Sequence, residues 1–186
     1  MINLKIITAS TRPGRRGIAV SRWVLDFLKH HPDFTTEHLD LAEINLPLMD
    51  EPHHPRLQQY TKEHTKDWSR KISEADAFVI VMPEYNHGFI APLKNAIDFL
   101  HNEWTYKAVG LVSYGGISAG TRAVQMLKPV LSVLKMLPLT ESVNIPFFES
   151  HIKEGVFVSS EMLNKNLSGM LSEIIKVDQG LRLIRG

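Results

Sequence analysis

The chain has 186 residues, which suits a single domain with a sizeable hydrophobic core. Hydrophobic residues make up 44% of the sequence and the formal net charge is only +1, so the composition favours neither nucleic acid nor an anionic membrane as a partner. The sequence contains no cysteine, which excludes disulfides, thiolate metal sites and a cysteine nucleophile and suits a reducing compartment.

The first half of the chain predicts two strands and two helices. A short apolar run at Leu4–Thr8 is of strand length, and apolar residues with helical spacing follow over Gly17–His30. Alternating residues at Thr35–Leu41 predict a second strand, which is followed by a proline-punctuated loop. The polar segment Leu57–Ala75 has an aromatic, histidine or isoleucine residue about every four positions and therefore predicts a helix.

The second half of the chain continues this alternation. Residues Ala77–Met82 are continuously apolar, as expected for a central parallel strand that is covered on both faces. Pro92 opens a helix that runs to Leu100. The remaining predicted elements are a strand at Ala108–Tyr114, a helix at Ala119–Leu137 that is interrupted or kinked near Pro129, a weaker strand at Leu139–Ile145, and a terminal helix at Ser159–Leu183.

Alternating strands and helices over residues 1–186 predict one α/β domain. Repeated βα units imply a parallel sheet with helices on both faces and right-handed crossovers. In such a sheet, ligands bind beyond the carboxyl ends of the strands, where the strand order reverses. The loops that follow the first, third and fourth predicted strands are therefore the candidate binding loops.

Signals for secretion or membrane insertion are not visible in the sequence. The N-terminus passes directly from Met1 into the first predicted strand. No apolar run approaches the ~20 residues that are needed to cross a bilayer. We therefore expect a cytoplasmic protein that does not bind membranes.

The first candidate loop, Ser10–Gly17, has the residue types that hold a phosphate. It offers the hydroxyls of Ser10 and Thr11, and it precedes a helix whose free N–H groups suit an anion. Its arginines are Arg12, Arg15 and Arg16. Three or four charge-assisted hydrogen bonds would contribute about 5–10 kcal/mol before the cost of binding is subtracted. The spacing matches neither a dinucleotide fingerprint nor a Walker loop, so a monophosphate is favoured over a solvated basic loop.

The second candidate loop contains Glu84, Tyr85, Asn86 and His87 directly after a buried strand. Tyr85 could lie against a planar ring, while the amide of Asn86 and nearby backbone N–H groups could bind the polar edge of that ring. The alternative is a turn in which Asn86 and Gly88 adopt left-handed conformations and the other residues only cap it.

The third candidate loop has two interpretations. Paired glycines at Gly115 and Gly116 let the backbone approach a flat ligand and expose N–H donors. Residues 116–120 also match Gly-x-Ser-x-Gly, the nucleophile elbow of α/β-hydrolases, which would make Ser118 a nucleophile. The acid and histidine candidates that follow in the required order are Glu141, Glu149 and His151. The chain is short for that fold, and the basic loop would then have no role.

Two further patterns have both a structural and a functional interpretation. The nine histidines show neither metal-binding spacing nor an accompanying carboxylate cluster, so we predict no metal site. The apolar residues between Met126 and Leu134 make a surface wider than one helix face usually needs, which indicates either core burial or a subunit interface.

Taken together, the three loops resemble those of the NADPH-dependent FMN reductase family of flavodoxin-like proteins, which includes quinone, azo-dye and chromate reductases. The resemblance spans roughly the first two thirds of the chain. It depends on Ala9–Gly17, Pro83–Gly88, Pro92–Asp98 and Ser113–Gly116. The Pro-Glu-Tyr-Asn block with the following Leu-Lys-Asn-Ala-Ile-Asp is its most specific part.

The resemblance implies a single flavodoxin-like domain with a five-stranded parallel sheet in the order 2-1-3-4-5, and FMN over the switch between strands one and three. The residues that it implies for the FMN phosphate are Ser10, Thr11, Arg12, Arg16, Gly17 and Ile18. Those that it implies for one edge of the isoalloxazine are Pro83, Glu84, Tyr85, Asn86 and Gly88. Those that it implies for another edge are Ser113, Tyr114, Gly115 and Gly116. Whether Arg15 or Arg16 contacts the phosphate stays open.

The implied function is an FMN-dependent NAD(P)H oxidoreductase. Hydride passes from NADPH or NADH to FMN and then to a quinone-like or other small-molecule acceptor, so the flavin performs the chemistry and no side chain is named as catalytic. Backbone donors of the turn at Gly115 and Gly116 would stabilise negative charge at the pyrimidine end of the reduced flavin. The family further implies a homodimer or homotetramer. The alternatives are a flavodoxin-type electron carrier, which the near-neutral charge disfavours, and the Ser118 hydrolase.

Overall fold

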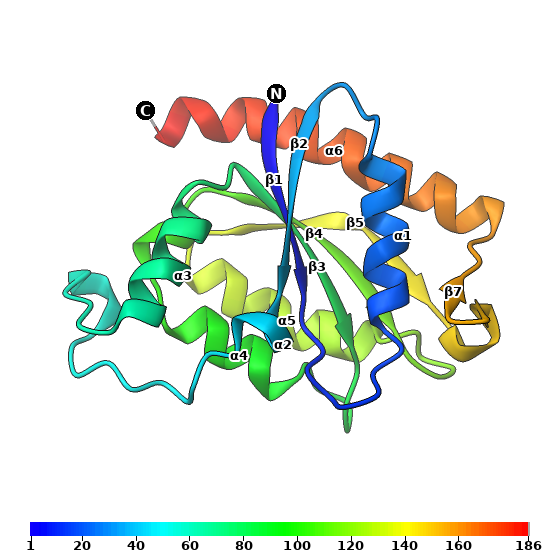
Figure 1. Cartoon of the computed structure of the whole chain (residues 1–186). Helices are drawn as coiled ribbons and strands as arrows, with labels where there is room; N and C mark the ends of the chain where they lie inside the picture. Colours follow the sequence, from blue (N-terminus) through cyan, green and yellow to red (C-terminus); the bar gives the residue numbers. More distant parts are fainter. Residues whose placement is uncertain (186) are drawn as a thin grey trace.

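The computed structural model describes residues 1–185 and contains a five-stranded parallel sheet (Figure 1). The strands are β1 (Ile2–Thr8), β2 (Phe34–Asp40), β3 (Ala77–Pro83), β4 (Ala108–Tyr114) and β5 (Leu137–Ile145). They lie in the order β2-β1-β3-β4-β5, and every neighbouring pair is parallel. The sheet order that the resemblance implied is therefore confirmed, and the strand order reverses between β1 and β3.

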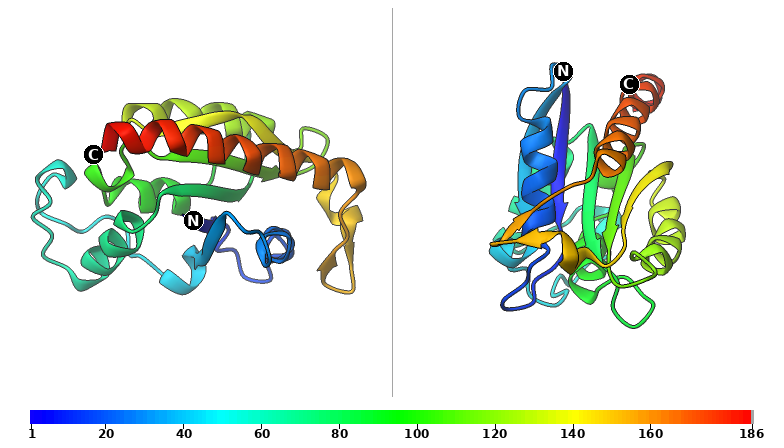
Figure 2. Two further views of the ribbon diagram at one scale, coloured as in Figure 1. Left: turned by 90° about the horizontal axis from the view of Figure 1, so that it is seen from above. Right: turned by 90° about the vertical axis from the view of Figure 1, so that its right-hand side faces the viewer.

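Helices cover both faces of the sheet. The main helices are α1 (Ile18–Leu28), α3 (Glu63–Ser73), α4 (Ala91–Asp98), α5 (Thr121–Val133) and α6 (Glu161–Arg185). One core cluster joins α1 and α6 to one face, and the other joins α3, α4 and α5 to the opposite face. Figure 2 shows α6 running beside β5, and the two elements are in contact.

Strand β3 shows how the sequence positions the sheet. All of its residues are buried, as its continuous apolar run predicts. Successive side chains of a strand point to opposite faces, so Phe78, Ile80 and Met82 pack under α3, α4 and α5. Ala77, Val79 and Val81 pack under α1 and α6. The two cores thus hold β3 in the middle and leave only its carboxyl end free to carry a ligand loop.

The structure differs from the prediction at several points, and the helix predicted to run to Leu137 ends at Val133, because Leu137 begins β5. The predicted helix from Leu57 is divided, because a short 3-10 turn, η1 (Pro55–Leu57), ends at Gln58 in a left-handed conformation and α3 begins only at Glu63. Helix α5 begins after two residues with positive φ, Ala119 and Gly120, and continues through Pro129 without interruption. The segment after β5 forms elements that the sequence did not predict. They are η3 (Phe148–His151) and the hairpin of β6 (Ile152–Lys153) and β7 (Val156–Phe157).

Two small elements complete the description of the chain. Helix α2 (Leu41–Ile44) follows β2 directly and is capped by the side chain of Asp40. The 3-10 turn η2 (Asn102–Trp104) precedes β4. Within residues 1–185, no helix is both long and apolar enough to cross a membrane.

Candidate active site

The three candidate loops meet at the carboxyl edge of the sheet, at the lower edge of the view in Figure 1. They line a hollow of about 160 Å³, together with the segment that follows β5. The lining residues are Ser10, Arg12, Gly14, Arg15, Arg16, Gly17, Pro83, Glu84, Tyr85, Tyr114, Gly115, Phe148 and Glu149. The structure therefore brings together residues from all three loops that the sequence analysis selected.

The start of α1 offers a run of free backbone donors to this hollow. Among the described residues, the N–H groups of Arg16, Gly17 and Ile18 make no hydrogen bond, although Gly17 is buried. Gly17 occupies the N-cap position and has no side chain to satisfy them. Buried backbone donors are rarely left unpaired, and a helix N-terminus carries partial positive charge. This cradle fits an anion such as the phosphate of a mononucleotide.

Arg15 and Arg16 have different environments. Arg15 forms a two-pronged ion pair with Asp40, in which Nη1 lies 2.6 Å from Oδ1 and Nη2 contacts Oδ2. The Asp40 side chain is only 1% exposed, and its hydrogen bond raises the pKa of Arg15. Arg16 is 47% exposed, and its nearest carboxylate is that of Glu149 at 3.6 Å. Arg15 therefore holds the loop onto β2, and Arg16 is the guanidinium that is free to turn to a ligand.

The second loop forms a tight turn. The N–H of Tyr85 donates to the carbonyl of Gly88 at 3.0 Å, and the N–H of Gly88 donates back at 2.9 Å. Asn86 and His87 have φ values of 49° and 67°, which is the pattern of a type I′ turn. The left-handed pair is thus Asn86 and His87, and not Asn86 and Gly88 as the turn interpretation expected. The turn leaves the Tyr85 side chain 42% exposed at its edge.

Glu84 connects the second loop to the third. Its side chain is 6% exposed, and it accepts hydrogen bonds from Arg122 Nε at 2.6 Å, from the Arg122 backbone N–H at 3.1 Å and from Ser118 Oγ at 3.2 Å. Burial alone would raise the pKa of Glu84, but the hydrogen bonds from Arg122 and Ser118 outweigh it and lower the pKa. The carboxylate therefore stays ionised and fastens the loop after β3 to the start of α5.

The same contacts decide against the hydrolase interpretation. Ser118 Oγ lies 2.7 Å from Arg122 Nη2 and also contacts Glu84, so a cation and a carboxylate surround it. In the described part of the chain, no histidine bonds to Ser118. His151 lies in η3, where its Nδ1 is 3.2 Å from the carbonyl of Val158. A serine nucleophile needs an available base within hydrogen-bond reach, and the carboxylate that Ser118 contacts, Glu84, is already bonded to Arg122.

The third loop uses some of its predicted donors within the fold. The Ser113 hydroxyl is buried and lies 2.8 Å from both the Ala119 carbonyl and Asn144 Oδ1. The N–H of Gly115 donates to the Ile145 carbonyl at 3.2 Å, so it extends the sheet and is not available to a ligand, contrary to our expectation. The N–H of Gly116 has no partner among residues 1–185. It is therefore available to a ligand.

Sequence reasoning missed two residues that matter for this site. Asp40, the partner of Arg15, lies at the end of β2, and its register pairs it with Thr8 at the end of β1. A carboxylate at the end of the neighbouring predicted strand was a usable signal. Phe148 lines the hollow and packs on Tyr114 with ring centroids 4.7 Å apart. Its segment carries no periodic pattern, so no sequence signal placed it there. Among the described residues there is no group of three metal-binding side chains.

The sheet order and the loops at its switch point define a flavodoxin-like α/β protein. The family model described as NADPH-dependent FMN reductase matches residues 2–150. The chain belongs to this family. The predictions of an FMN-dependent oxidoreductase that uses NAD(P)H are thereby confirmed, and an electron carrier or a hydrolase is not favoured.

Individual relatives agree with this assignment. The chain is 35% identical to the NAD(P)H-dependent FMN reductase ntnL of Nectria sp., over 95% of this chain and 93% of that protein. It is 39% identical to the NAD(P)H-dependent FMN reductase C4B3.06c of Schizosaccharomyces pombe, over 87% and 82% of the two chains. Among solved structures, FerB of Paracoccus denitrificans, a flavoenzyme NAD(P)H:(acceptor) oxidoreductase, superposes with a TM-score of 0.77 at 18% identity, over 95% of this chain and 98% of FerB.

Proposed function

We propose that residues 1–186 form one reductase domain whose hollow holds the FMN phosphate, and that it passes electrons from NADPH or NADH to quinone-like or other small acceptors. The observation that carries the phosphate position is the run of three free N–H groups, Arg16 to Ile18, at the start of α1. A phosphate would accept hydrogen bonds from this run, and the guanidinium groups of Arg12 and Arg16 would balance its charge.

The other loops would hold the flat end of the cofactor. The proposed contact residues are those that the resemblance implied, namely Ser10, Thr11, Arg12, Arg16, Gly17, Ile18, Pro83, Glu84, Tyr85, Asn86, Gly88, Ser113, Tyr114, Gly115 and Gly116. Tyr85 would provide an aromatic surface at the edge of a rigid turn, and the free N–H of Gly116 would donate to the polar edge. Glu84, Ser113 and Gly115 would act by fixing the loops, because their polar groups are already bonded within the fold.

When bound, FMN supplies the two-electron chemistry that links a nicotinamide donor to an acceptor. The chain's own residues then bind and orient the cofactor, and they do not transfer protons. Glu84 is ionised and paired with Arg122, and Ser118 is bonded to both, so neither is placed as an acid or a base. The proposed site therefore has no catalytic side chain.

We further propose that the protein is a cytoplasmic homodimer or homotetramer. Helix α5 and the loop before it expose large apolar side chains, with Ile117 at 82%, Met126 at 53% and Val133 at 75%. A second copy of the chain would cover such a surface. Size-exclusion chromatography with light scattering tests this, and a monomer at micromolar concentration would contradict it.

Whether the protein binds FMN can be tested by spectroscopy. The purified protein is mixed with FMN and dialysed, and its absorbance spectrum and flavin fluorescence are recorded. We expect retained flavin bands, and oxidation of NADPH or NADH when a soluble benzoquinone is added. A protein that is colourless after dialysis and oxidises neither NADPH nor NADH would contradict the proposal. Arg16→Ala tests the phosphate position, because it removes the exposed guanidinium while Arg15 keeps the loop attached to Asp40.

A further inference from the structure

Polar side chains from three elements meet at the base of the Ser10–Gly17 loop. The hydroxyl of Thr8, the last residue of β1, lies 2.6 Å from Ser21 Oγ in α1 and 2.7 Å from His38 Nε2 in β2. Thr8 is only 1% exposed, and Ser21 is fully buried. One hydroxyl therefore joins the strand that precedes the loop, the helix that follows it and the neighbouring strand.

The roles assigned so far do not explain this polar cluster. Thr8, Ser21 and His38 do not line the proposed phosphate hollow. Polar groups are costly to bury unless they are hydrogen-bonded, so apolar side chains would suffice if these positions only filled the core. Burial lowers the pKa of His38 below its ordinary value of 6.5, so the ring is neutral at pH 7 and bonds to Thr8 without adding a charge. A hydroxyl has one proton, so Thr8 can donate to only one of its two partners, and both contacts depend on it.

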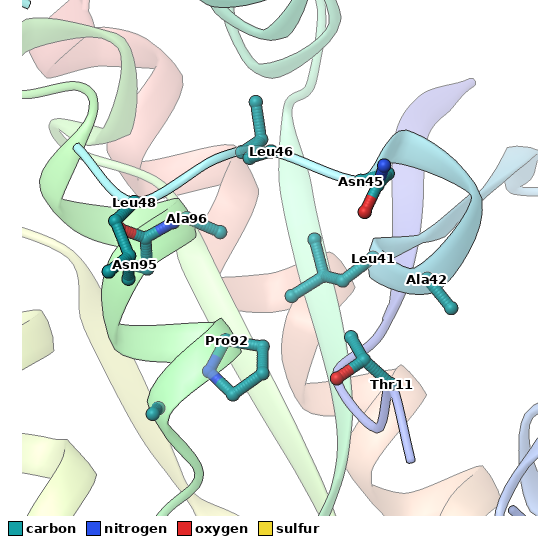
Figure 3. A pocket seen from close by; sticks show the side chains of 10 residues that line it. Thr11, Leu41, Ala42, Asn45, Leu46, Leu48, Pro92, Asn95 and Ala96 are labelled. Atoms are coloured by element: carbon teal, nitrogen blue, oxygen red, sulfur yellow. The ribbon is translucent and has the colours of Figure 1, made fainter. Parts of the chain in front are cut away.

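The outer side of the loop borders open space. Thr11 lines a hollow of about 390 Å³ between the α2 segment and α4, as Figure 3 shows. The stretch from Thr11 to Arg15 also lines a hollow of about 480 Å³ over the end of β2. In the middle of the loop, Arg15 bonds to Asp40 and to the Ser10 carbonyl. The position of the loop therefore depends on a few polar contacts more than on close packing of its outer side.

The contact between Thr8 and Ser21 closes the loop at its base. The first end of the loop is fixed to β3, because the Ala9 N–H donates to the Val81 carbonyl at 2.9 Å. Ser21 lies in the first turn of α1, next to the free N–H groups of Arg16 to Ile18. A shift of this turn would move the N–H groups relative to the end of β1. The Thr8–Ser21 contact therefore sets the distance between the two sides of the anion cradle.

We propose that Thr8 is a positioning residue for the FMN phosphate. Its hydroxyl, bonded to Ser21 and His38, holds the start of α1 where the free N–H groups can share one anion. This inference rests on the proposed function, which places the phosphate at these groups. Donors that the fold has already ordered bind an anion more tightly than donors that become ordered only on binding. The effect of Thr8 is therefore confined to the phosphate and does not extend to the flavin ring.

The test compares FMN with riboflavin, which differs from FMN only in lacking the phosphate. Flavin-free protein is titrated with each compound, and binding is followed by flavin fluorescence. Thr8→Val removes the hydroxyl and keeps the branched shape, so it should weaken FMN about fivefold to tenfold and riboflavin less than about twofold. Thr8→Ser keeps the hydroxyl and should bind FMN within about twofold of the parent protein. Thr36→Val is the matched control, because Thr36 is half-buried on β2 and its hydroxyl has no partner among residues 1–185.

Ser21→Ala removes the other side of the same contact. Because Thr8 and Ser21 share one hydrogen bond, Thr8→Val/Ser21→Ala should weaken FMN no more than the stronger single variant does, whereas independent losses would multiply. Circular dichroism at the titration temperature checks that each variant is folded.

The inference is overturned if Thr8→Val weakens FMN and riboflavin equally, if Thr8→Ser or Thr36→Val weakens FMN as much as Thr8→Val, or if the effects of the two single variants multiply. A parent protein that binds FMN no more tightly than riboflavin would instead contradict the proposed phosphate position, so the two failures are distinguishable.

Discussion

The hydroxyl of Tyr114 lies 1.8 Å from the point that a Cβ on residue 17 would occupy, and the ring atom Cζ lies 2.4 Å from it. Gly17 is therefore required by the packing of a side chain from the third loop. Tyr114 is buried and packs on Phe148, so its ring has little room to withdraw. The start of α1 and the end of β4 are in this way packed directly against each other beneath the proposed phosphate site.

Gly17→Ala should destabilise the protein by about 1–3 kcal/mol, the usual cost of overpacking, and should weaken FMN binding because the free N–H groups would shift. Urea unfolding and a flavin fluorescence titration measure the two effects. Gly169→Ala in α6 is the matched control, since a Cβ there meets nothing within 4 Å and alanine favours a helix. In a Tyr114→Leu background, the cost of Gly17→Ala should shrink. Equal costs in both backgrounds would refute the steric explanation.

Arg15→Ala and Arg16→Ala should separate stability from ligand binding. Removing Arg15 leaves the buried Asp40 carboxylate unpaired, which typically costs about 3–5 kcal/mol. Removing the exposed Arg16 should change the free energy of unfolding by no more than about 0.5 kcal/mol but weaken FMN binding about tenfold. Arg15→Ala/Asp40→Ala is the control and should recover part of the stability. The assignment fails if Arg16→Ala destabilises the fold as much as Arg15→Ala.

The sequence predicted the strands, and the loops that meet at the carboxyl edge of the sheet, because their signals are local. The continuous apolar run of β3 and the position of Pro92 at the start of α4 each follow from short-range patterns. The residue types of the loop after β1 indicated an anion site, and the free N–H groups at the start of α1 are consistent with such a site.

The partners of individual side chains could not be predicted in the same way. Whether Arg15 or Arg16 faces the ligand depends on Asp40, which lies 25 positions away in the sequence from Arg15. The role of Glu84 depends on Arg122, at a separation of 38 positions. Such pairs are set by the register of the parallel strands and the packing of α5, and neither is encoded in a local pattern. The I′ turn was also missed, because His87 is not a residue type that signals positive φ as strongly as glycine.

Arg122→Ala should destabilise the protein more than Glu84→Gln/Arg122→Ala, in which both charges of the ion pair are removed. The single variant leaves Glu84 as a nearly buried carboxylate with only Ser118 and backbone donors, which we expect to cost about 2–4 kcal/mol. Glu84→Gln/Arg122→Ala removes the uncompensated charge and should be more stable than Arg122→Ala alone. Thermal unfolding of the flavin-free and flavin-loaded proteins measures this. A double variant that is less stable than Arg122→Ala would show that geometry, and not charge balance, dominates the contact.

Acid unfolding should reveal the carboxylate that binds the segment just before α3. Glu51 accepts hydrogen bonds from the backbone N–H groups of Thr61 at 2.8 Å and Lys62 at 2.9 Å. Burial alone would raise the pKa of Glu51, but these hydrogen bonds outweigh it and lower the pKa to about 2, from an ordinary value of 4.5. Because the folded pKa lies below the unfolded one, the stabilisation is complete above pH 4.5 and is lost as the pH falls toward 2.

Glu51→Gln should therefore lower Tm at pH 7 by about 2–4 °C, which corresponds to roughly 1 kcal/mol for a chain of this size after allowance for partial solvent screening. The difference from the parent protein should shrink between pH 4.5 and 2, because protonation of Glu51 then removes the same charge in the parent. Glu141→Gln is the control, since Glu141 is exposed and has no hydrogen-bond or ion-pair partner among residues 1–185. A Tm difference for Glu51→Gln that stays constant from pH 7 to about pH 2 would mean that the loss comes from altered packing at the start of α3 and not from the carboxylate charge.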